Sequence, residues 1–152
     1  MTSSRIVGYA PGAYDLFHIG HLNILRTAKS QCDYLIAGVI SDQMFRDVRH
    51  MDPFVPASER AEIVQHIEYV DQVHIETTAE KLDAWEVLRF DRIFKGDDWR
   101  GTPRGEKLEA DFATVGVEVC YFPYTVHTSS SMLRQSLTQA MELIRHVDDA
   151  LH

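Results

Sequence analysis

The sequence has little cysteine, no long apolar run and few basic residues. Only two cysteines occur, Cys32 and Cys120, with no CxxC pair and no Cys/His spacing suited to zinc. We therefore expect two reduced thiols that line the core of a protein in a reducing compartment. No apolar run approaches the roughly 18 residues of a membrane span, and the N-terminus lacks the apolar core of a secretory signal. These absences predict a cytoplasmic protein that does not associate with a membrane.

Acidic residues outnumber basic ones, 23 against 15, and the net charge is −8. Because nucleic-acid surfaces need clustered lysine and arginine, we expect no nucleic-acid partner. A small anionic ligand remains compatible, since a few local cations or a helix N-terminus can bind one. The 152 residues are 45% apolar and 25% charged, which is a globular composition. The length predicts a single domain over residues 1–152.

Short apolar runs alternate with helical patterns along the chain. The predicted strands are Arg5–Ala10, Tyr34–Ile40, Val70–Ile75, Arg92–Lys95 and Val117–Phe122. The predicted helices span residues 19–30, 57–67, 79–89 and 103–114, with a long final helix over 129–149. Strands that alternate with helices and are apolar almost throughout are typical of a parallel sheet covered on both faces. We predict an α/β fold, a Rossmann-like three-layer α/β/α sandwich with a five-stranded parallel sheet and a C-terminal helix.

The final helix carries an apolar stripe at helical spacing, which includes Leu133, Leu137, Ala140, Met141, Ile144 and Val147. Three serines, Ser129, Ser130 and Ser131, precede the stripe and suit a helix N-cap. The stripe predicts packing of this helix against the domain or against a partner subunit.

Two histidines, His18 and His21, stand three residues apart where the first strand gives way to the first helix. In parallel sheets, ligands bind at the carboxyl ends of strands beside helix N-termini, which attract phosphate. On a helix the two imidazoles share one face, and Gly20 leaves the surface between them free for a bulky anion. Both rings can donate hydrogen bonds to one phosphate and stabilise charge that develops on it. The spacing therefore predicts a phosphate site.

The stretch GAYDLFHIGHLNILRTAK at residues 12–29 resembles the signature of the cytidylyltransferase family. The resemblance continues through DYLIAGVISD (33–42), PASERAEIVQHIEYVDQV (56–73) and FKGDDW (94–99) to the last helix. It implies transfer of CMP from CTP to a small phosphorylated alcohol, such as glycerol 3-phosphate or a similar polyol phosphate, with release of pyrophosphate. It further implies Mg²⁺ bound through the nucleotide phosphates, no metal site made by the protein itself, and a homodimer with Glu68–Asp71 near the interface.

The same resemblance assigns roles to individual residues. The catalytic group is His18, His21, Arg134 and Arg49. The nucleotide-binding group is Gly12, Ala13, Tyr14, Asp15, Gly20, Gly96, Asp97, Asp98, Thr125, Ser129, Ser130 and Ser131. The substrate-binding group is His50, Trp99 and Arg100.

Several family positions differ in this chain. Ala13 stands where the glycerol branch has a threonine, and the lysine expected after the second strand is replaced by His50, with Arg49 beside it. Two family arginines are replaced by Glu68 and Tyr124. We expect compensation from the basic residues His127, Arg100 and Arg104. The changes bear more on the acceptor than on the reaction.

Three other interpretations follow from the same residues. HIGH also occurs in class I aminoacyl-tRNA synthetases, but this chain is far too short and has no KMSKS-like segment. An adenylyltransferase that uses ATP on a sugar or polyol phosphate matches Ser129–Arg134 about equally well. A nucleotide-binding module without turnover is the alternative that the missing arginines suggest, and nucleotide binding without pyrophosphate release would identify it.

Overall fold

The computed structural model describes residues 4–123 and 128–151. A five-stranded sheet lies at its centre in the order β3-β2-β1-β4-β5, and all four strand pairings are parallel. The strands are β1 (Val7–Gly12), β2 (Tyr34–Ile40), β3 (Gln72–Glu76), β4 (Arg92–Gly96) and β5 (Glu118–Phe122). The predicted Rossmann-like α/β fold is confirmed, and each predicted strand lies within two residues of its expected bounds.

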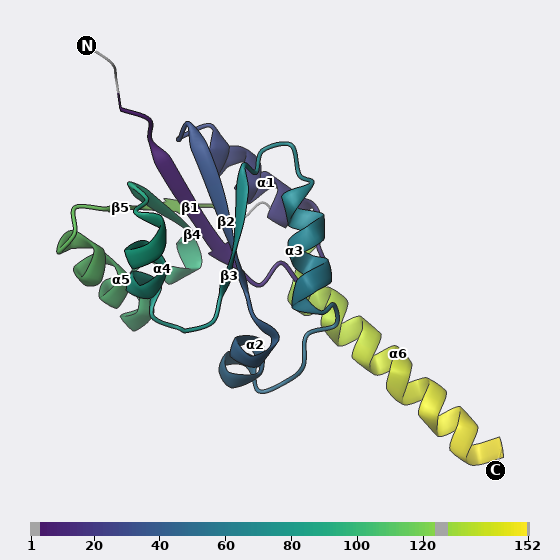
Figure 1. Cartoon of the computed structure of the whole chain (residues 1–152). Helices are drawn as coiled ribbons and strands as arrows, with labels where there is room; N and C mark the ends of the chain where they lie inside the picture. The colour runs from purple at the N-terminus through teal and green to yellow at the C-terminus, as the bar shows by residue number, and fades with distance from the viewer. Residues whose placement is uncertain (1–3, 124–127, 152) are drawn as a thin grey trace.

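Helices cover both faces of the sheet (Figure 1). One face carries α1 (Ile19–Lys29) and α3 (Ala57–Gln65), and the other carries α4 (Lys81–Leu88) and α5 (Pro103–Ala113). Because successive strand residues point to opposite faces, Tyr9 and Ala10 belong to two different core clusters. Cys32 and Cys120 are free thiols that pack against the cluster beneath α1 and α3, as expected.

One helix is absent from the sequence prediction, which has a loop after the second strand. The structure instead has α2 (Asp42–Arg49) there. Ser41 Oγ accepts a hydrogen bond from the Met44 amide at 3.1 Å and caps the helix. Met44 and the neighbouring Phe45 are buried and anchor it to the domain. Met44, Phe45 and Val48 do stand at helical spacing, but the helix has only eight residues and is mostly polar, so the apolar signal is too short to predict it.

The final helix, α6 (Ser130–Leu151), begins where predicted, since Ser129 Oγ accepts from the Met132 amide at 3.1 Å. Beyond its first turns it extends away from the sheet (Figure 1). Leu137, Met141 and Ile144 are 41%, 54% and 61% exposed. The prediction that this stripe packs against the domain is therefore wrong, and the alternative of a partner subunit stays a prediction. Within the described ranges, no helix has the length and apolar character needed to cross a bilayer.

Candidate active site

A cavity of about 1000 Å³ opens at the carboxyl ends of β1 and β4. These neighbouring strands form the point where the strand order reverses, which is the usual ligand site of such sheets. Its walls come from the β1–α1 loop, the end of β4 and the 3₁₀ turn that follows β4 (Asp97–Trp99). The N-terminal ends of α1, α4 and α6 and parts of α2 and α5 complete the lining. The cavity has a histidine end, around His18 and His21, and a lysine end, around Lys81, Lys95 and Arg104.

At the histidine end, two imidazoles meet at one hydroxyl. The ring centroids of His18 and His21 are 4.1 Å apart. Ser130 Oγ lies 3.1 Å from His18 Nε2 and 3.4 Å from His21 Nε2. The same hydroxyl donates to the carbonyl oxygen of Asp15 at 2.9 Å. The N-terminal ends of α1 and α6 are thereby joined at the cavity wall.

The hydrogen bonds determine which ring nitrogen of each histidine carries the proton. The Gly20 amide donates to His18 Nδ1 at 3.0 Å, and the His18 amide donates to His21 Nδ1 at 3.2 Å. Each Nδ1 is therefore an acceptor, and each neutral ring carries its proton on Nε2. The Ser130 hydroxyl donates its own hydrogen to the carbonyl oxygen of Asp15, so its oxygen accepts from both rings. Two N–H donors consequently converge on one oxygen atom at the cavity wall.

Burial keeps both rings uncharged. Desolvation lowers the pKa of His18 below its ordinary value. Burial, together with the neighbouring His18, lowers the pKa of His21 to about 3, although Asp15 acts in the opposite direction. Both rings are therefore neutral donors near pH 7.

Asp15 is buried at the histidine end, where its carboxylate binds two backbone amides and neutralises Arg134. Its carboxylate accepts from the amides of Phe54 and Val55 at 3.0 and 2.9 Å, and from Arg134 Nη2 at 2.9 Å. Asp15 is 1% exposed, and these bonds lower its pKa despite the opposing effect of burial. The guanidinium of Arg134 lines the cavity with its charge already paired.

Tyr14 packs against His21 at the histidine end. Its ring lies 5.5 Å from that of His21, and its hydroxyl donates to the Ala10 carbonyl at 2.8 Å. Tyr14 and Leu16 both have φ of 54°, a left-handed conformation that is costly for bulky residues and is found at sites where the surroundings impose it. The β1–α1 loop is therefore held in one shape by its contacts.

Arg60 is a functional support that the sequence prediction missed. Although its side chain is almost fully buried, it donates to the carbonyl oxygens of Ala13 at 2.7 Å, Ile40 at 2.9 Å and Val55 at 2.8 Å, and to Asp42 at 2.8 Å. It thus ties the β1–α1 loop to the end of β2. The only sequence signal is its place in the stretch PASER, which the family resemblance includes without giving it a role.

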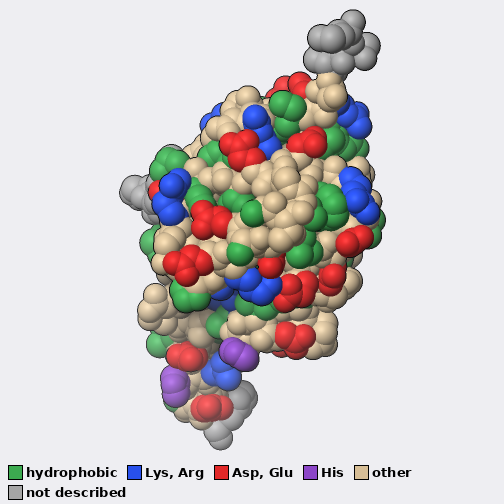
Figure 2. All heavy atoms as spheres, turned by 90° about the vertical axis from the view of Figure 1, so that its left-hand side faces the viewer, with side chains coloured by type: hydrophobic (Ala, Val, Ile, Leu, Met, Phe, Trp, Pro, Cys, Tyr) green, Lys and Arg blue, Asp and Glu red, His purple; other side chains and the backbone are tan. Residues whose placement is uncertain are grey.

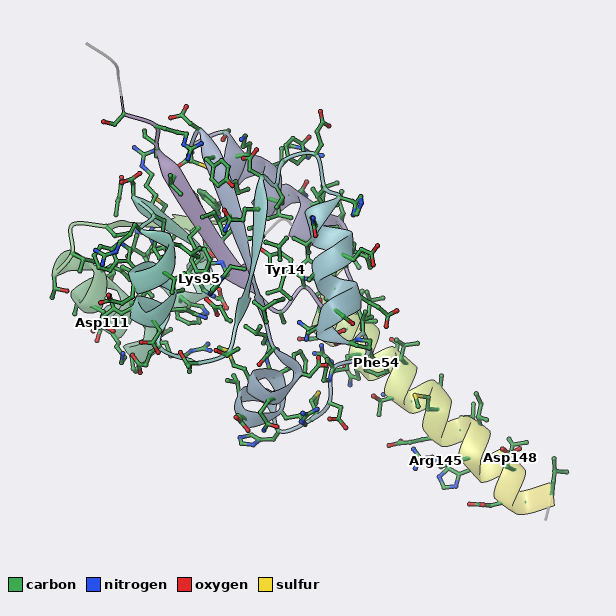
Figure 3. The ribbon with its side chains drawn as sticks, in the orientation of Figure 1. Tyr14, Phe54, Lys95, Asp111, Arg145 and Asp148 are labelled. Atoms are coloured by element: carbon green, nitrogen blue, oxygen red, sulfur yellow. The ribbon has the colours of Figure 1, made fainter. Side chains whose placement is uncertain are left out.

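The lysine end was missed as well, apart from Arg104. Lys95 Nζ lies 4.0 Å from the centroid of the Trp99 ring, and Arg104 Cζ lies 4.5 Å from the same ring. Burial, together with Lys81 and Arg104, lowers the pKa of Lys95 to about 7, against the opposing effect of Glu76 and Asp98. Figure 3 places Lys95 and Tyr14 on opposite sides of the sheet.

The structure brings most of the predicted site residues to this cavity, and it leaves three outside. The residues that line it are Gly12, Ala13, Tyr14, Asp15, His18, Gly20, His21, Arg49, Gly96, Asp98, Trp99, Ser129, Ser130, Ser131 and Arg134. His50, Asp97 and Arg100 are not among its lining residues. His50 caps the end of α2 with φ of 57°, and Arg100 lies over the Tyr121 ring at 4.8 Å. Thr125 and His127 fall outside the described residues.

Comparisons with known proteins agree with this geometry. A cytidylyltransferase-like family model matches residues 9–136. Glycerol-3-phosphate cytidylyltransferase of Staphylococcus aureus is 33% identical over 134 residues, which cover 88% of this chain and 94% of that protein. FAD synthase of Thermococcus kodakarensis is 39% identical over 133 residues, which cover 86% and 89%.

A solved structure shares the fold. The lipopolysaccharide core biosynthesis protein from Thermoplasma volcanium superposes with a TM-score of 0.69 at 20% identity, over 82% of this chain and 100% of that one. The family match covers most of the chain, and it agrees with the sheet order and with the paired histidines at the end of β1. The chain therefore belongs to the cytidylyltransferase-like family of nucleotidyltransferases.

Proposed function

We propose that the protein transfers CMP from CTP to a small phosphorylated alcohol and releases pyrophosphate. The observation that carries this proposal is the pair of neutral Nε2–H donors, His18 and His21, which converge on Ser130 Oγ at 3.1 and 3.4 Å. A phosphate oxygen that takes the place of this hydroxyl oxygen would accept both bonds. The N-terminal ends of α1 and α6 add backbone amides at the same point.

The chemistry needs few protein groups. A phosphate oxygen of the acceptor attacks the α-phosphorus, forming a new P–O bond, while the bond to the β-phosphate oxygen breaks and pyrophosphate leaves. The attacking oxygen is already ionised at neutral pH, so no general base is required. Catalysis then rests on alignment and on stabilising charge at the departing phosphates. His18, His21 and the α6 N-terminus would supply that stabilisation.

Mg²⁺ would reach the site on the nucleotide. The described residues contain no group of three His, Cys, Asp or Glu side chains that could hold a metal, and the Asp15 carboxylate is already engaged by two amides and Arg134. Phosphate oxygens suit Mg²⁺, which usually binds proteins through few side chains. When bound, the ion would neutralise part of the phosphate charge.

Adenylyl transfer is the second candidate function. The relative named FAD synthase makes a product that contains an adenine nucleotide, and it matches this chain at 39% identity. The match to glycerol-3-phosphate cytidylyltransferase supports CTP, together with a phosphorylated alcohol as acceptor. Gly96, Asp98 and Trp99, at and after the end of β4, line the cavity and would be available to contact the base.

Pyrophosphate release tests both candidates. CTP and ATP, each with Mg²⁺, are crossed with glycerol 3-phosphate, ribitol phosphate, phosphocholine and phosphoethanolamine, with His18→Ala as control. Release with CTP and a polyol phosphate that disappears in the variant is the expected result. Release with ATP alone would make the protein an adenylyltransferase. Nucleotide binding without release from any pair would contradict the proposed activity and favour a binding module.

We further propose that the chain acts as a homodimer. Leu137, Ile144 and Leu151 on α6 are exposed and are spaced by seven residues, the repeat of helices that pack along one another. The interface predicted near Glu68–Asp71 stays a prediction. Sedimentation of the whole chain beside a variant that ends at residue 136 would locate the interface. A dimer that survives the truncation would exclude the outer part of α6.

A further inference from the structure

The lysine end of the cavity gathers three cations from three elements. Lys95 lies at the end of β4, Lys81 is the first residue of α4, and Arg104 is in the first turn of α5. All three line the same cavity as the histidines. Figure 2, viewed from the side of α4 and α5, shows basic side chains beside a hollow in the lower part of this face, with acidic side chains around them.

The positive charge at this end is only partly neutralised. Lys81 Nζ pairs with Glu76 at 2.5 Å, and the other carboxylate oxygen of Glu76 accepts from the Tyr9 hydroxyl. Among the residues that the structure describes, Lys95 and Arg104 have no carboxylate within 4.0 Å. They lie instead against the ring of Trp99. The nearby carboxylates of Glu76 and Asp98 do not offset the burial of Lys95 beside two other cations. A bound anion would offset it.

The position of this cluster suits one reactant of the proposed transfer. In an in-line displacement, the attacking and leaving oxygens lie on opposite sides of the phosphorus. If pyrophosphate leaves at the histidine end, the attacking oxygen must approach from the other end of the cavity. Lys95 and the Tyr14 ring that supports His21 lie on opposite sides of the sheet (Figure 3).

We propose that Lys95 and Arg104, with Lys81 behind them, form the subsite that binds the phosphate of the acceptor. The inference rests on the proposed transferase function and adds to it the location of the second substrate. It also narrows the acceptor's chemical class. A quaternary ammonium group is usually bound on an aromatic face, but here two cations already lie against Trp99. The acceptor is therefore an uncharged polyol or sugar that carries one phosphate, rather than phosphocholine.

Lys95→Met tests the subsite, because methionine keeps a flexible apolar stem but removes the charge. Lys107→Met is the matched control, since Lys107 also lines the cavity but is exposed and already paired with Glu80 at 2.9 Å and Asp111 at 2.7 Å. A lost charge-assisted contact should raise the acceptor KM by about 10- to 100-fold in Lys95→Met. The nucleotide KM should change less than twofold, and Lys107→Met should change the acceptor KM less than threefold. An unchanged acceptor KM, or an equal rise in both KM values, would overturn the subsite.

Calorimetry separates failure of the subsite from failure of the proposed function. Glycerol 3-phosphate is titrated into protein that contains Mg²⁺ and α,β-methylene CTP, a nucleotide that cannot react, or the corresponding ATP analogue. Lys95→Met should bind glycerol 3-phosphate about 10- to 100-fold more weakly than the wild type does, and Lys107→Met should bind it within threefold of the wild type. Equal affinities of the wild type and Lys95→Met would overturn the subsite. If no nucleotide–acceptor pair releases pyrophosphate, the transferase proposal fails, and this titration still decides whether Lys95 binds a phosphomonoester.

Discussion

The two ends of the cavity hold phosphate-binding groups in opposite states. At the histidine end the main polar groups already have partners: His18 and His21 converge on Ser130, and Arg134 Nη2 is paired with Asp15, although Arg134 Nε has no partner. At the lysine end, Lys95 and Arg104 lie against an aromatic ring without a carboxylate partner among the described residues. The histidine end thus offers oriented neutral donors, whereas the lysine end offers charge.

This difference matches the demands of the two ends in the proposed reaction. Donors that are fixed before the reaction lose nothing to reorganisation when charge develops on a leaving group. A free substrate with a dianionic phosphate is instead captured by unbalanced positive charge, and its binding completes the charge balance of the site. Substitutions at the histidine end therefore test the contrast between oriented donors and free charge.

The largest expected effect comes from removing one oriented donor at the histidine end. His18 also caps α1, so alanine would remove both the cap and the donor. In His18→Asn, the side chain still caps the helix but no longer reaches the phosphates. We expect kcat to fall by about 10²- to 10³-fold, the loss found for single donors to developing charge, with a melting temperature close to that of the wild type.

Steady-state pyrophosphate release and thermal melting, measured on the same preparations, check this prediction. His18→Ala serves as the comparison, because it should lose about 1 kcal/mol of stability in addition to the activity. Retention of more than a tenth of the wild-type kcat by His18→Asn would contradict the view that the histidine end works through fixed donors.

The second prediction unbalances the histidine end. Asp15→Asn removes the charge that neutralises Arg134, which is only 8% exposed. Breaking a buried ion pair from one side costs about 3–5 kcal/mol of unfolding free energy, and the amide group must also face backbone N–H donors. Urea unfolding measures the loss. Asp52→Asn is the control, because its pair with Arg46 at 3.3 Å is exposed and should contribute less than about 1 kcal/mol. Equal losses of unfolding free energy in the two variants would show that the buried Asp15–Arg134 pair contributes no more to stability than an exposed pair.

The third prediction concerns pH. The pKa of His21 in the native state is lowered to about 3, whereas an unfolded histidine titrates near 6.5. Between these values the unfolded chain binds a proton that the native protein does not, so stability falls as the pH drops below about 6.5. The lowered pKa of His18 acts in the same direction. One such group changes the unfolding free energy by up to about 1.4 kcal/mol per pH unit, or roughly 2 kcal/mol between pH 6.5 and 5.

Urea unfolding of the wild type and His21→Gln across this pH range tests the assignment, since glutamine keeps a neutral hydrogen-bonding group but cannot titrate. The wild type should lose stability more steeply on acidification than the variant does. Parallel curves would mean that His21 titrates normally, and the neutral-donor description of the histidine end would then fail.

The histidine end was predictable from the sequence, and the lysine end was not. His18, Gly20 and His21 are contiguous, and they follow an apolar strand, so the pattern itself identifies a phosphate site. Lys81, Lys95 and Arg104 belong to three separate elements that meet only because of the strand order. Lys95 also lies within an apolar run, where the pattern indicates a strand and nothing more.

The fold was predictable for a related reason. Buried parallel strands are apolar almost throughout, and Tyr34–Ile40 was predicted with the bounds that the structure has. The α2 helix was missed because it is only eight residues long and mostly polar, and it is fixed by the Ser41 cap and the burial of Met44 and Phe45. The direction of α6 was missed because an apolar stripe does not specify what covers it.

The smallest expected effect separates geometry from stability at the histidine end. Gly20 lies in the first turn of α1, where alanine would favour the helix by about 0.5–1 kcal/mol over glycine. A Cβ there would meet His18 Cε1 at 2.7 Å, so the imidazole must shift by several tenths of an ångström. Gly20→Ala should therefore lower kcat by about tenfold, since small misplacements of catalytic groups are costly, while the melting temperature stays level or rises.

The control is Ser58→Ala in α3, because Ser58 lies outside the residues that line the cavity. Gly101→Ala is unsuitable as a control, because the φ of 76° at Gly101 would strain alanine. If Gly20→Ala kept full activity, the exact direction of the His18 donor would not matter, and the histidine end would differ from the lysine end only in charge.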